Sequence, residues 1–339
     1  MGKPPDEGGR PSRTAHMSYD VIGDIHGEYD KLVALLAKLG YRETGGTWRH
    51  PARKALFVGD FIDRGPNQVK TVNLVRSMTD AGSALAVMGN HEFNAIAWFT
   101  PDPANPGEFL RPHFSEKYGS KNREQHAAFL AEVEARPGLH KEIIEWFLTL
   151  PLWLDLPGLR VVHACWHQPF MEHLRPKLRE GDRLTYDLLI EATREPPDEQ
   201  KDTPEPSTFK ATEALLKGIE IPLPSGYSFR DKDGFPRSRV RVRWWDGEAD
   251  TYQKAALLGR EWRDRLPASA VPSHVRIGYG GEQPVVVGHY WLPPDGRPTP
   301  FSEKVACVDY SAARGGPLVA YRWTGESILR ENNFVTSSD

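Results

Sequence analysis

The chain has 339 residues, a hydrophobic content of 39% and a formal net charge of −3. This length predicts about two domains, or one large domain with an insertion, and it allows a sizeable core. The small net charge gives no sign of stable nucleic-acid binding. The two cysteines lie far apart, no apolar run is long enough to span a membrane, and the N-terminus lacks the apolar core of a signal peptide. We therefore expect a soluble cytoplasmic protein without a membrane partner.

Three similar units of strand, loop and helix follow a segment, 1–16, that is rich in Gly, Pro and charge and is predicted to be disordered. Short apolar runs predict strands at 19–22, 55–58 and 84–88, and Gly-Asp or Gly-Asn follows each of them. Leucines at helical spacing follow the first strand, and Gly40 provides a stop signal. Such alternation predicts a parallel or mixed sheet with helices on its faces.

The second half of the chain is less regular. A hairpin is predicted at 153–162, a further strand begins at Pro284, and a final hairpin joins 305–309 to 317–323. The intervening part is charged and Pro-rich, has few long apolar runs and indicates an inserted cap of about 110 residues. The predicted division is 1–16 for the N-terminal segment, 17–170 and 284–332 for the core, and 171–283 for the cap.

Polar side chains stand at the exits of five predicted strands, where open α/β sheets bind ligands. Carboxylate, imidazole and carboxamide groups suit divalent Mn, Fe or Zn. Asp60 can bridge two ions, because a carboxylate has two oxygens. In two-metal sites the ions clamp the attacking and leaving oxygens of a displacement at phosphorus, and a shared water becomes a hydroxide nucleophile. We expect one ion on Asp24, His26 and Asp60, and the other on Asp60, Asn90, His163 and His289.

Four glycine-containing motifs occur in order along the chain: Gly-Asp-Ile-His-Gly at 23–27, Gly-Asp-Phe-Ile-Asp-Arg-Gly at 59–65, Gly-Asn-His-Glu at 89–92 and Gly-His at 288–289. Together they resemble the calcineurin-like metallophosphoesterase superfamily. The Asp-Arg-Gly and Asn-His-Glu forms resemble its phosphoprotein phosphatase branch and bacterial relatives. These relatives include diadenosine tetraphosphatases and the phosphatase module of bacterial polynucleotide kinase-phosphatases. The resemblance implies an α/β fold, a β-sandwich core flanked by helices, and leaves the inserted cap undescribed.

The resemblance also implies roles for individual residues. His91 would protonate the leaving oxygen while Asp63 orients its ring. Arg64 would grip the phosphoryl oxygens as a planar fork, and Asn90 would contact both metal and phosphate. The chain departs from the family at two places. Ala-Cys follows His163 where the phosphatases usually carry two glycines, and Trp291 replaces a second histidine found in many members, which leaves the first ion three protein ligands.

Four arginines alternate along the cap, and this period of two predicts a strand with all four guanidinium groups on one face. They are Arg237, Arg239, Arg241 and Arg243. A solvated strand face is one interpretation. In the other, this strand lies over the metal site and supplies a second phosphate-binding arginine, Arg241 or Arg243. For the motif residues the competing interpretation is simple turn chemistry, since Asp and Asn cap helices well. The other eight histidines, among them His126 and His167, are assigned structural roles.

The predicted function is hydrolysis of phosphomonoesters, in the manner of a protein serine/threonine phosphatase, by attack of a metal-bridging hydroxide. Two Mn²⁺ ions are the first choice of cofactor, with Fe or Zn as alternatives. The predicted partner is a phosphorylated protein, small phosphomonoester or nucleotide. A second hypothesis is a hydrolase of dinucleoside polyphosphates, such as diadenosine tetraphosphate, or of RNA-end phosphates. A third, from another class, is a phosphate-binding module that has lost catalysis.

Overall fold

The computed structural model describes residues 17–230 and 236–338, so the segment 1–16 lies outside the described residues. Two sheets form the centre of the fold. The first has the strand order β15-β14-β1-β4-β5, and the second has the order β13-β12-β7-β6. The strands are β1 Ser18–Ile22, β4 Arg53–Phe57, β5 Ala84–Ala86, β14 Val319–Trp323 and β15 Phe334–Thr336 in the first sheet, and β6 Trp153–Leu156, β7 Leu159–Val162, β12 Val285–Val287 and β13 Val305–Cys307 in the second.

The strands that lead to the predicted site are parallel neighbours. In the first sheet β1 pairs in parallel with β4 and β4 with β5. In the second sheet β12 pairs in parallel with both β7 and β13. The carboxyl ends of parallel neighbours lie at one edge of a sheet, so the polar residues after these strands are brought together.

An apolar layer between the sheets makes the core a sandwich. Val21 and Leu56 of the first sheet and Val161 and Val286 of the second belong to one fully buried cluster. The opposite faces of both sheets are covered by helices whose apolar residues join the main hydrophobic cluster. The predicted α/β sandwich flanked by helices is confirmed.

Helices follow the first three exits as the apolar spacing predicts. They are α1 Tyr29–Leu39, α2 Gln68–Asp80 and α3 Asn90–Phe99. Helix α1 buries all four of its leucines on one face, which is the consequence of their period of 3.6 residues. It ends at Gly40, whose φ of 97° is a left-handed conformation that glycine adopts without strain.

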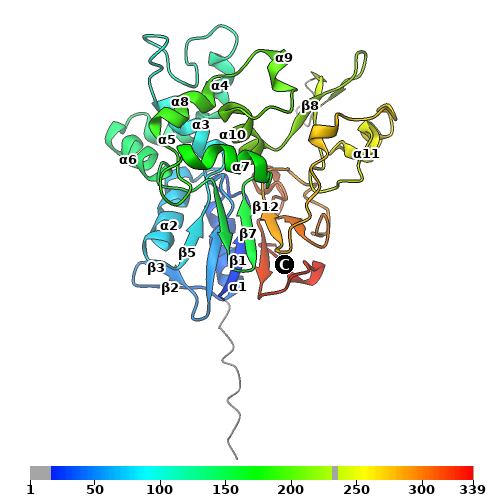
Figure 1. Cartoon of the computed structure of the whole chain (residues 1–339). Coiled ribbons are helices and arrows are strands. Elements are labelled where there is room, and N and C mark those ends of the chain that lie inside the picture. Colours follow the sequence, from blue (N-terminus) through cyan, green and yellow to red (C-terminus); the bar gives the residue numbers. More distant parts are fainter. Residues whose placement is uncertain (1–16, 231–235, 339) are drawn as a thin grey trace, which may run out of the picture.

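The other helices gather at the end of the sandwich where the strand exits lie. Figure 1 shows α3, α7, α8 and α10 together above the strands β1, β7 and β12. No described helix is long and apolar enough to cross a membrane. The helices at this end of the sandwich, besides α3, are α4 Gly119–Gln125, α5 Ala127–Val133, α6 Pro137–Phe147, α7 Gln168–Leu174, α8 Tyr186–Thr193, α9 Asp198–Lys201 and α10 Thr208–Lys217. A small hairpin, β2 Arg42–Thr44 with β3 Thr47–Arg49, lies outside the two sheets.

Part of the predicted cap has a hydrophobic core of its own. Ile221, Val240, Tyr252 and Val271 belong to a separate cluster. We name residues 219–230, 236–243 and 246–275 the cap lobe; it lies at the upper right of Figure 1, around β8 and α11. Its elements are β8 Glu220–Pro222, β9 Phe229–Arg230, β10 Pro236–Arg237, β11 Arg239–Arg241, α11 Tyr252–Ala255 and α12 Arg260–Arg263.

The rest of the predicted cap shares the core of the sandwich. Met171, Leu188 and Leu215 from helices α7, α8 and α10 belong to the main cluster. Trp244 does so too, and its Nε1–H donates to the hydroxyl of Tyr290 at 2.9 Å. We therefore propose that the independent unit is the cap lobe rather than the whole of 171–283.

Two predicted elements were wrong. The strands β13 and β14 do not form a hairpin, because β13 pairs with β12 in one sheet and β14 pairs with β1 in the other. The alternating arginines do not share one strand either. It is interrupted at Ser238, and Arg243 lies beyond the end of β11. For β13 and β14 the local pattern was right for a strand, but the pairing partners were decided by distant segments.

Candidate active site

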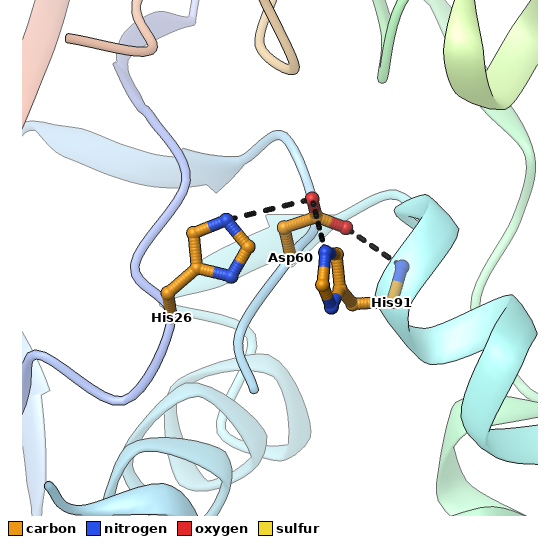
Figure 2. Close-up of side chains that lie close together, drawn as sticks. All are labelled: His26, Asp60 and His91. Atoms are coloured by element: carbon orange, nitrogen blue, oxygen red, sulfur yellow. Dashed lines mark hydrogen bonds and ion pairs between the residues drawn. The ribbon is translucent and has the colours of Figure 1, made fainter. Parts of the chain in front are cut away.

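Asp60 is the centre of the site. It follows β4 after Val58 and Gly59 and is 1% exposed. Its Oδ1 accepts the backbone N–H of His91 at 2.9 Å. Its Oδ2 has no hydrogen-bond partner and faces ring nitrogens: it lies 3.7 Å from Nε2 of His26 and 3.3 Å from Nε2 of His163. Figure 2 shows the carboxylate between the rings of His26 and His91. A buried carboxylate with one oxygen held and the other left without a hydrogen bond is suited to bind a cation.

Two imidazole rings present the nitrogen that a metal requires. Nδ1 of His26 donates to the carbonyl of Ile62 at 2.8 Å, and Nδ1 of His163 donates to the carbonyl of Val58 at 2.7 Å. A carbonyl can only accept, so both rings carry a proton on Nδ1. Nε2 of His26 has no hydrogen-bond partner, and Nε2 of His163 faces Oδ1 of Asn90 and Oδ2 of Asp60. Burial, followed by repulsion from His91, lowers the pKa of His26 to about 3, which favours the neutral ring. A ring fixed through its other nitrogen is the usual arrangement of a metal-binding histidine.

Asn90 and His289 complete a second set of ligands. Oδ1 of Asn90 lies 3.1 Å from Nε2 of His163 and 2.8 Å from Nδ1 of His289. Among the described residues, two groups offer ligand atoms within 4.8 Å of one another, and they share Asp60. These groups are Asp60 with His163 and His289, and His26 with Asp60 and His91.

Asp24 lies beside these groups but outside both of them. Its Oδ2 accepts the backbone N–H of His289 at 2.9 Å, and its buried Oδ1 has no partner. Burial, and then the charges of Asp309 and Asp60, raise the pKa of Asp24 well above its ordinary value. Buried acids that repel one another in this way would be stabilised by a divalent cation, so the residues present fit the metal ions that the motifs imply.

Gly288 shows how closely the two sheets approach at this point. A Cβ atom added to it would lie 2.0 Å from Oδ1 of Asp24. No side chain fits there unless the carboxylate moves. The glycine of the Gly-His motif is therefore required for the position of Asp24.

His91 is held by Asp63 rather than by a backbone carbonyl. Its Nδ1 donates to Oδ2 of Asp63 at 2.6 Å, while its Nε2 lies 3.9 Å from Oδ2 of Asp60. Burial by itself would lower the pKa of His91, but the carboxylates of Asp60 and Asp63 raise it above its ordinary value. A ring favoured in its protonated form, with Nε2 directed toward the ligand groups, is arranged to donate a proton.

The assignment of a structural role to His126 missed a contact in this pair. Nδ1 of His126 donates to the other oxygen of Asp63, Oδ1, at 2.9 Å. His167, by contrast, caps helix α7 by accepting the backbone N–H of Phe170 at 3.3 Å, as a structural role predicts. The sequence around His126 lies in a charged stretch without a recognisable motif, so it contained no signal for this contact.

Glu92 was also missed, although it belongs to the Gly-Asn-His-Glu motif. Its carboxylate accepts three backbone N–H groups, from Asp60 at 2.7 Å, Phe61 at 2.8 Å and Gly89 at 3.0 Å. Burial and the charge of Asp60 raise the pKa of Glu92 to about 7. Its role is to join the exits of β4 and β5, which places Asp60 and Asn90 side by side.

Backbone strain is concentrated in the site loops. Eight described residues other than glycine have a positive φ, and six of them belong to these loops. Such conformations are costly and persist only where the surrounding structure imposes them, which is typical of functional sites. The six are His26 (50°), Asp60 (54°), Asp63 (70°), Arg64 (75°), His289 (72°) and Trp291 (49°).

The predicted phosphate-binding arginines have different environments. The exposed guanidinium of Arg64 lies 4.4 Å from the ring centroid of Trp291, whose ring is 5.3 Å from that of His26. Trp291, which stands in place of a second histidine, thus supports the arginine beside the predicted metal ligands. This cation–π contact holds the guanidinium against the indole ring.

Arg241 and Arg243 point to different places. Nε of Arg241 lies 3.3 Å from a carboxylate oxygen of Glu220. Burial, and then the charge of Arg241, lower the pKa of His289 well below its ordinary value. Arg243 pairs with Asp246 at 3.4 Å and lines a cavity of about 510 Å³ in the cap lobe, together with Lys254. Of the two arginines, Arg241 is thus the one whose charge bears on a predicted metal ligand.

Comparison with known proteins finds relatives named as bis(5'-nucleosyl)-tetraphosphatases. The asymmetrical bis(5'-nucleosyl)-tetraphosphatase PrpE of Oceanobacillus iheyensis is 33% identical over 159 residues, which cover 47% of this chain and 58% of that protein. PrpE of Geobacillus sp. is 50% identical over 76 residues, 22% of this chain and 31% of that protein. The matched segments thus span only about a third to three fifths of these relatives.

Solved structures with a similar course of the chain are more distant. The cold-active protein-tyrosine phosphatase of a psychrophilic Shewanella is 17% identical, with 95% of this chain and 80% of that chain covered and a TM-score of 0.46. A protein serine/threonine phosphatase from Saccharomyces cerevisiae is 13% identical, with 96% and 80% covered and a TM-score of 0.42. These likenesses are too weak to bear on the site.

The family itself is established by a match that spans most of the predicted core. The family model described as calcineurin-like phosphoesterase matches residues 17–211. This range contains the exits of β1, β4, β5 and β7, and with them Asp24, Asp60, Asn90 and His163. The chain belongs to the calcineurin-like phosphoesterase family.

Proposed function

We propose that the protein hydrolyses phosphomonoesters with the help of two divalent metal ions. The observation that carries the proposal is the position of His91. Its ring is held by Asp63 at 2.6 Å and lies at the edge of the ligand groups that share Asp60. A proton donor fixed beside a cation site is what cleavage of a phosphate ester with a poor leaving group requires.

The ions would occupy the two sets of ligands predicted from the sequence. Four buried ligand atoms without a hydrogen-bond partner support this placement: Oδ1 of Asp24, Nε2 of His26, Oδ2 of Asp60 and Nε2 of His289. Bound there, divalent metals would supply Lewis acidity at the phosphoryl oxygens and an acidified water as nucleophile. Mixed oxygen and nitrogen ligands favour Mn²⁺, with Fe or Zn as alternatives. The proposed sets are Asp24, His26 and Asp60, and Asp60, Asn90, His163 and His289.

The remaining residues would bind the phosphoryl group and move the proton. Arg64 would hold phosphoryl oxygens with its planar fork while Trp291 keeps the guanidinium in place. The amide of Asn90 would donate to another phosphoryl oxygen, and Arg241 would approach from the cap lobe. His91 would give the proton on Nε2 to the leaving oxygen, with the resulting lone pair on Nε2 and the Nδ1–H still bonded to Asp63.

The first proposal, hydrolysis of monoesters, and a second candidate, hydrolysis of dinucleoside polyphosphates, differ in the basicity of the leaving group. An alkoxide is a poor leaving group and needs the acid, whereas the phosphate released from an anhydride leaves without much help. The buried, carboxylate-held His91 therefore favours monoesters. The names of the relatives favour the second candidate, hydrolysis of dinucleoside polyphosphates.

A direct test is an assay of the purified protein with Mn²⁺ on four substrates: p-nitrophenyl phosphate, its bis-ester, a phosphoserine peptide and diadenosine tetraphosphate. Turnover of the phosphopeptide and of p-nitrophenyl phosphate, abolished by a chelator and restored by Mn²⁺, is the expected result. Faster turnover of diadenosine tetraphosphate than of either monoester would replace the first proposal by the second candidate. Absence of turnover on all four, with phosphate still bound, would establish a binding module instead.

A further inference from the structure

His126 lies where helix α4 ends and helix α5 begins, far in sequence from the strand exits. Its ring is 2% exposed and packs between the rings of Trp98, 6.0 Å away, and Phe129, 5.0 Å away. Nδ1 is 2.9 Å from Oδ1 of Asp63, 63 positions earlier in the chain. Since an ionised carboxylate can only accept, Nδ1 carries the proton and donates it. The ring is thus a buried donor to a carboxylate that also serves the acid.

The carboxylate of Asp63 has one ring donor on each oxygen. His91 occupies Oδ2 at 2.6 Å and His126 occupies Oδ1 at 2.9 Å. Rotation of the carboxylate plane would stretch both bonds at once. Burial by itself would raise the pKa of Asp63, but the two rings, His126 foremost, lower it below its ordinary value. The contact with His126 is therefore part of what keeps this buried group ionised and oriented.

Helix α5, which begins directly after His126, also holds the loop that carries Asp63. The backbone N–H of Asp63 donates to Oε1 of Gln68 at 2.6 Å. Glu132 in α5 accepts the backbone N–H groups of Gln68 at 2.7 Å and Val69 at 3.0 Å. Helix α5 thus holds this loop through Glu132 at the start of α2, and His126, just before α5, holds the carboxylate itself.

We propose that His126 is a positioning residue, which orients the carboxylate of Asp63 so that its second oxygen keeps Nε2 of His91 directed at the leaving group. The inference rests on the proposed function for the part that His91 plays in turnover, and on geometry alone for the part that Asp63 plays in holding His91. His126 does not touch the substrate. Its loss should leave binding of the phosphoryl group intact and weaken protonation of the leaving oxygen.

The matched variants are His126→Leu, which removes the donor, and His126→Asn, whose Nδ2–H₂ stands the same number of bonds from the backbone as Nδ1. His126→Gln places its amide one bond further away and serves as a misplaced donor. The control is His140→Leu, because His140 is a buried histidine that packs on the same Phe129, at 5.5 Å, and has no described contact with Asp63.

The first measurement compares a poor with a good leaving group. For His126→Leu we expect kcat on a phosphoserine peptide to fall about 10- to 100-fold while kcat on p-nitrophenyl phosphate falls less than about 3-fold, since general acid catalysis matters most when the leaving group is a strong base. KM should stay near the wild-type value on both. His126→Asn should recover most of the loss. His126→Gln should show the loss, because its donor is misplaced, and His140→Leu should not show it. Equal loss on both substrates, or equal activity of His126→Asn and His126→Gln, would overturn the proposal.

The second measurement needs no turnover. In the Zn²⁺-loaded protein, which is diamagnetic, the imidazole N–H protons hydrogen-bonded to Asp63 should give protected low-field ¹H resonances from His91 and His126. In His126→Leu the His91 resonance should shift and exchange faster with water, whereas His126→Asn and His140→Leu should keep it. An unchanged His91 resonance in His126→Leu would contradict the inference. If the wild-type protein turns over neither ester, the proposed function fails and this measurement still decides whether His126 orients the pair.

Discussion

The strand-exit site and the cap lobe hold their charged side chains in different ways. In the site, Asp60 and Asp63 are 1% and 2% exposed. One oxygen of Asp60 accepts a backbone N–H, and both oxygens of Asp63 accept ring N–H groups. In the cap lobe, Arg241 is one third exposed and pairs with the similarly exposed Glu220. Burial makes each hydrogen bond in the site obligatory, because an unpaired buried charge is costly. Exposed pairs contribute about 0–1 kcal/mol and are screened by salt, so the arginine can reorient at little cost.

This difference implies a division of labour. We propose that the two sheets fix the geometry needed for chemistry, and that the cap lobe offers cations that can adapt to an incoming anion. If the division is right, substitutions in the site should change turnover or metal content by large factors. Substitutions in the cap lobe should change substrate affinity or local stability by small ones.

The largest effect is expected for Asp60→Asn, since Asp60 belongs to both ligand groups. The substitution removes the charge that both ions would share, and the amide nitrogen cannot act as a ligand. We expect kcat to fall by more than about 10³-fold together with a loss of bound metal. Elemental analysis and an assay with p-nitrophenyl phosphate measure the two effects. Full metal content in the variant would show that Asp60 is not the bridge.

His91→Asn should come next, and it should separate chemistry from metal binding. The ring is bonded to Asp63 through Nδ1, and its role as a proton donor predicts a loss of about 10²- to 10⁴-fold in kcat. Metal content should remain that of the wild type, because the substitution leaves all the proposed metal ligands in place. A metal-free His91→Asn protein would instead make His91 a ligand, as its place in one of the two ligand groups would also allow.

A smaller effect is expected for Arg241→Ala, which tests the cap lobe directly. Loss of a guanidinium near His289 should raise KM about 10-fold with little change in kcat, if Arg241 contacts the substrate phosphate. Arg243→Ala is the matched comparison, since Arg243 pairs with Asp246 and lines a separate cavity. Steady-state kinetics of both variants decide the point. If both leave KM and kcat unchanged, the cap lobe supplies no phosphate-binding arginine.

The smallest effect on activity is expected for Val240→Ala. Val240 is 1% exposed and lies in the hydrophobic cluster of the cap lobe, which is separate from the cluster between the sheets. The cavity should destabilise the lobe by about 1–3 kcal/mol while metal binding stays as in the wild type. Thermal unfolding followed by tryptophan fluorescence, alongside metal titration, tests this. A weakened metal site would mean that the lobe and the sandwich do not behave as separate units.

The sequence by itself determined which side chains gather at the strand exits, and most of the core. Each ligand motif is a short continuous segment at a strand exit, and parallel strands bring such exits to one edge whatever the rest of the chain does. Asp60, His26, His163 and Asn90 could therefore be placed near one another in advance. The leucine stripe of α1 was equally predictable, because helical period and burial are local properties.

Tertiary structure decided which distant segments meet. The contact of His126 with Asp63 spans 63 positions, and no periodic pattern or motif in the sequence predicts it. The same holds for Arg241 rather than Arg243 acting on His289, and for the separation of β13 and β14 into two sheets. Such contacts depend on how helices and sheets pack against each other, and packing is a property of the whole folded chain that short stretches of sequence do not encode.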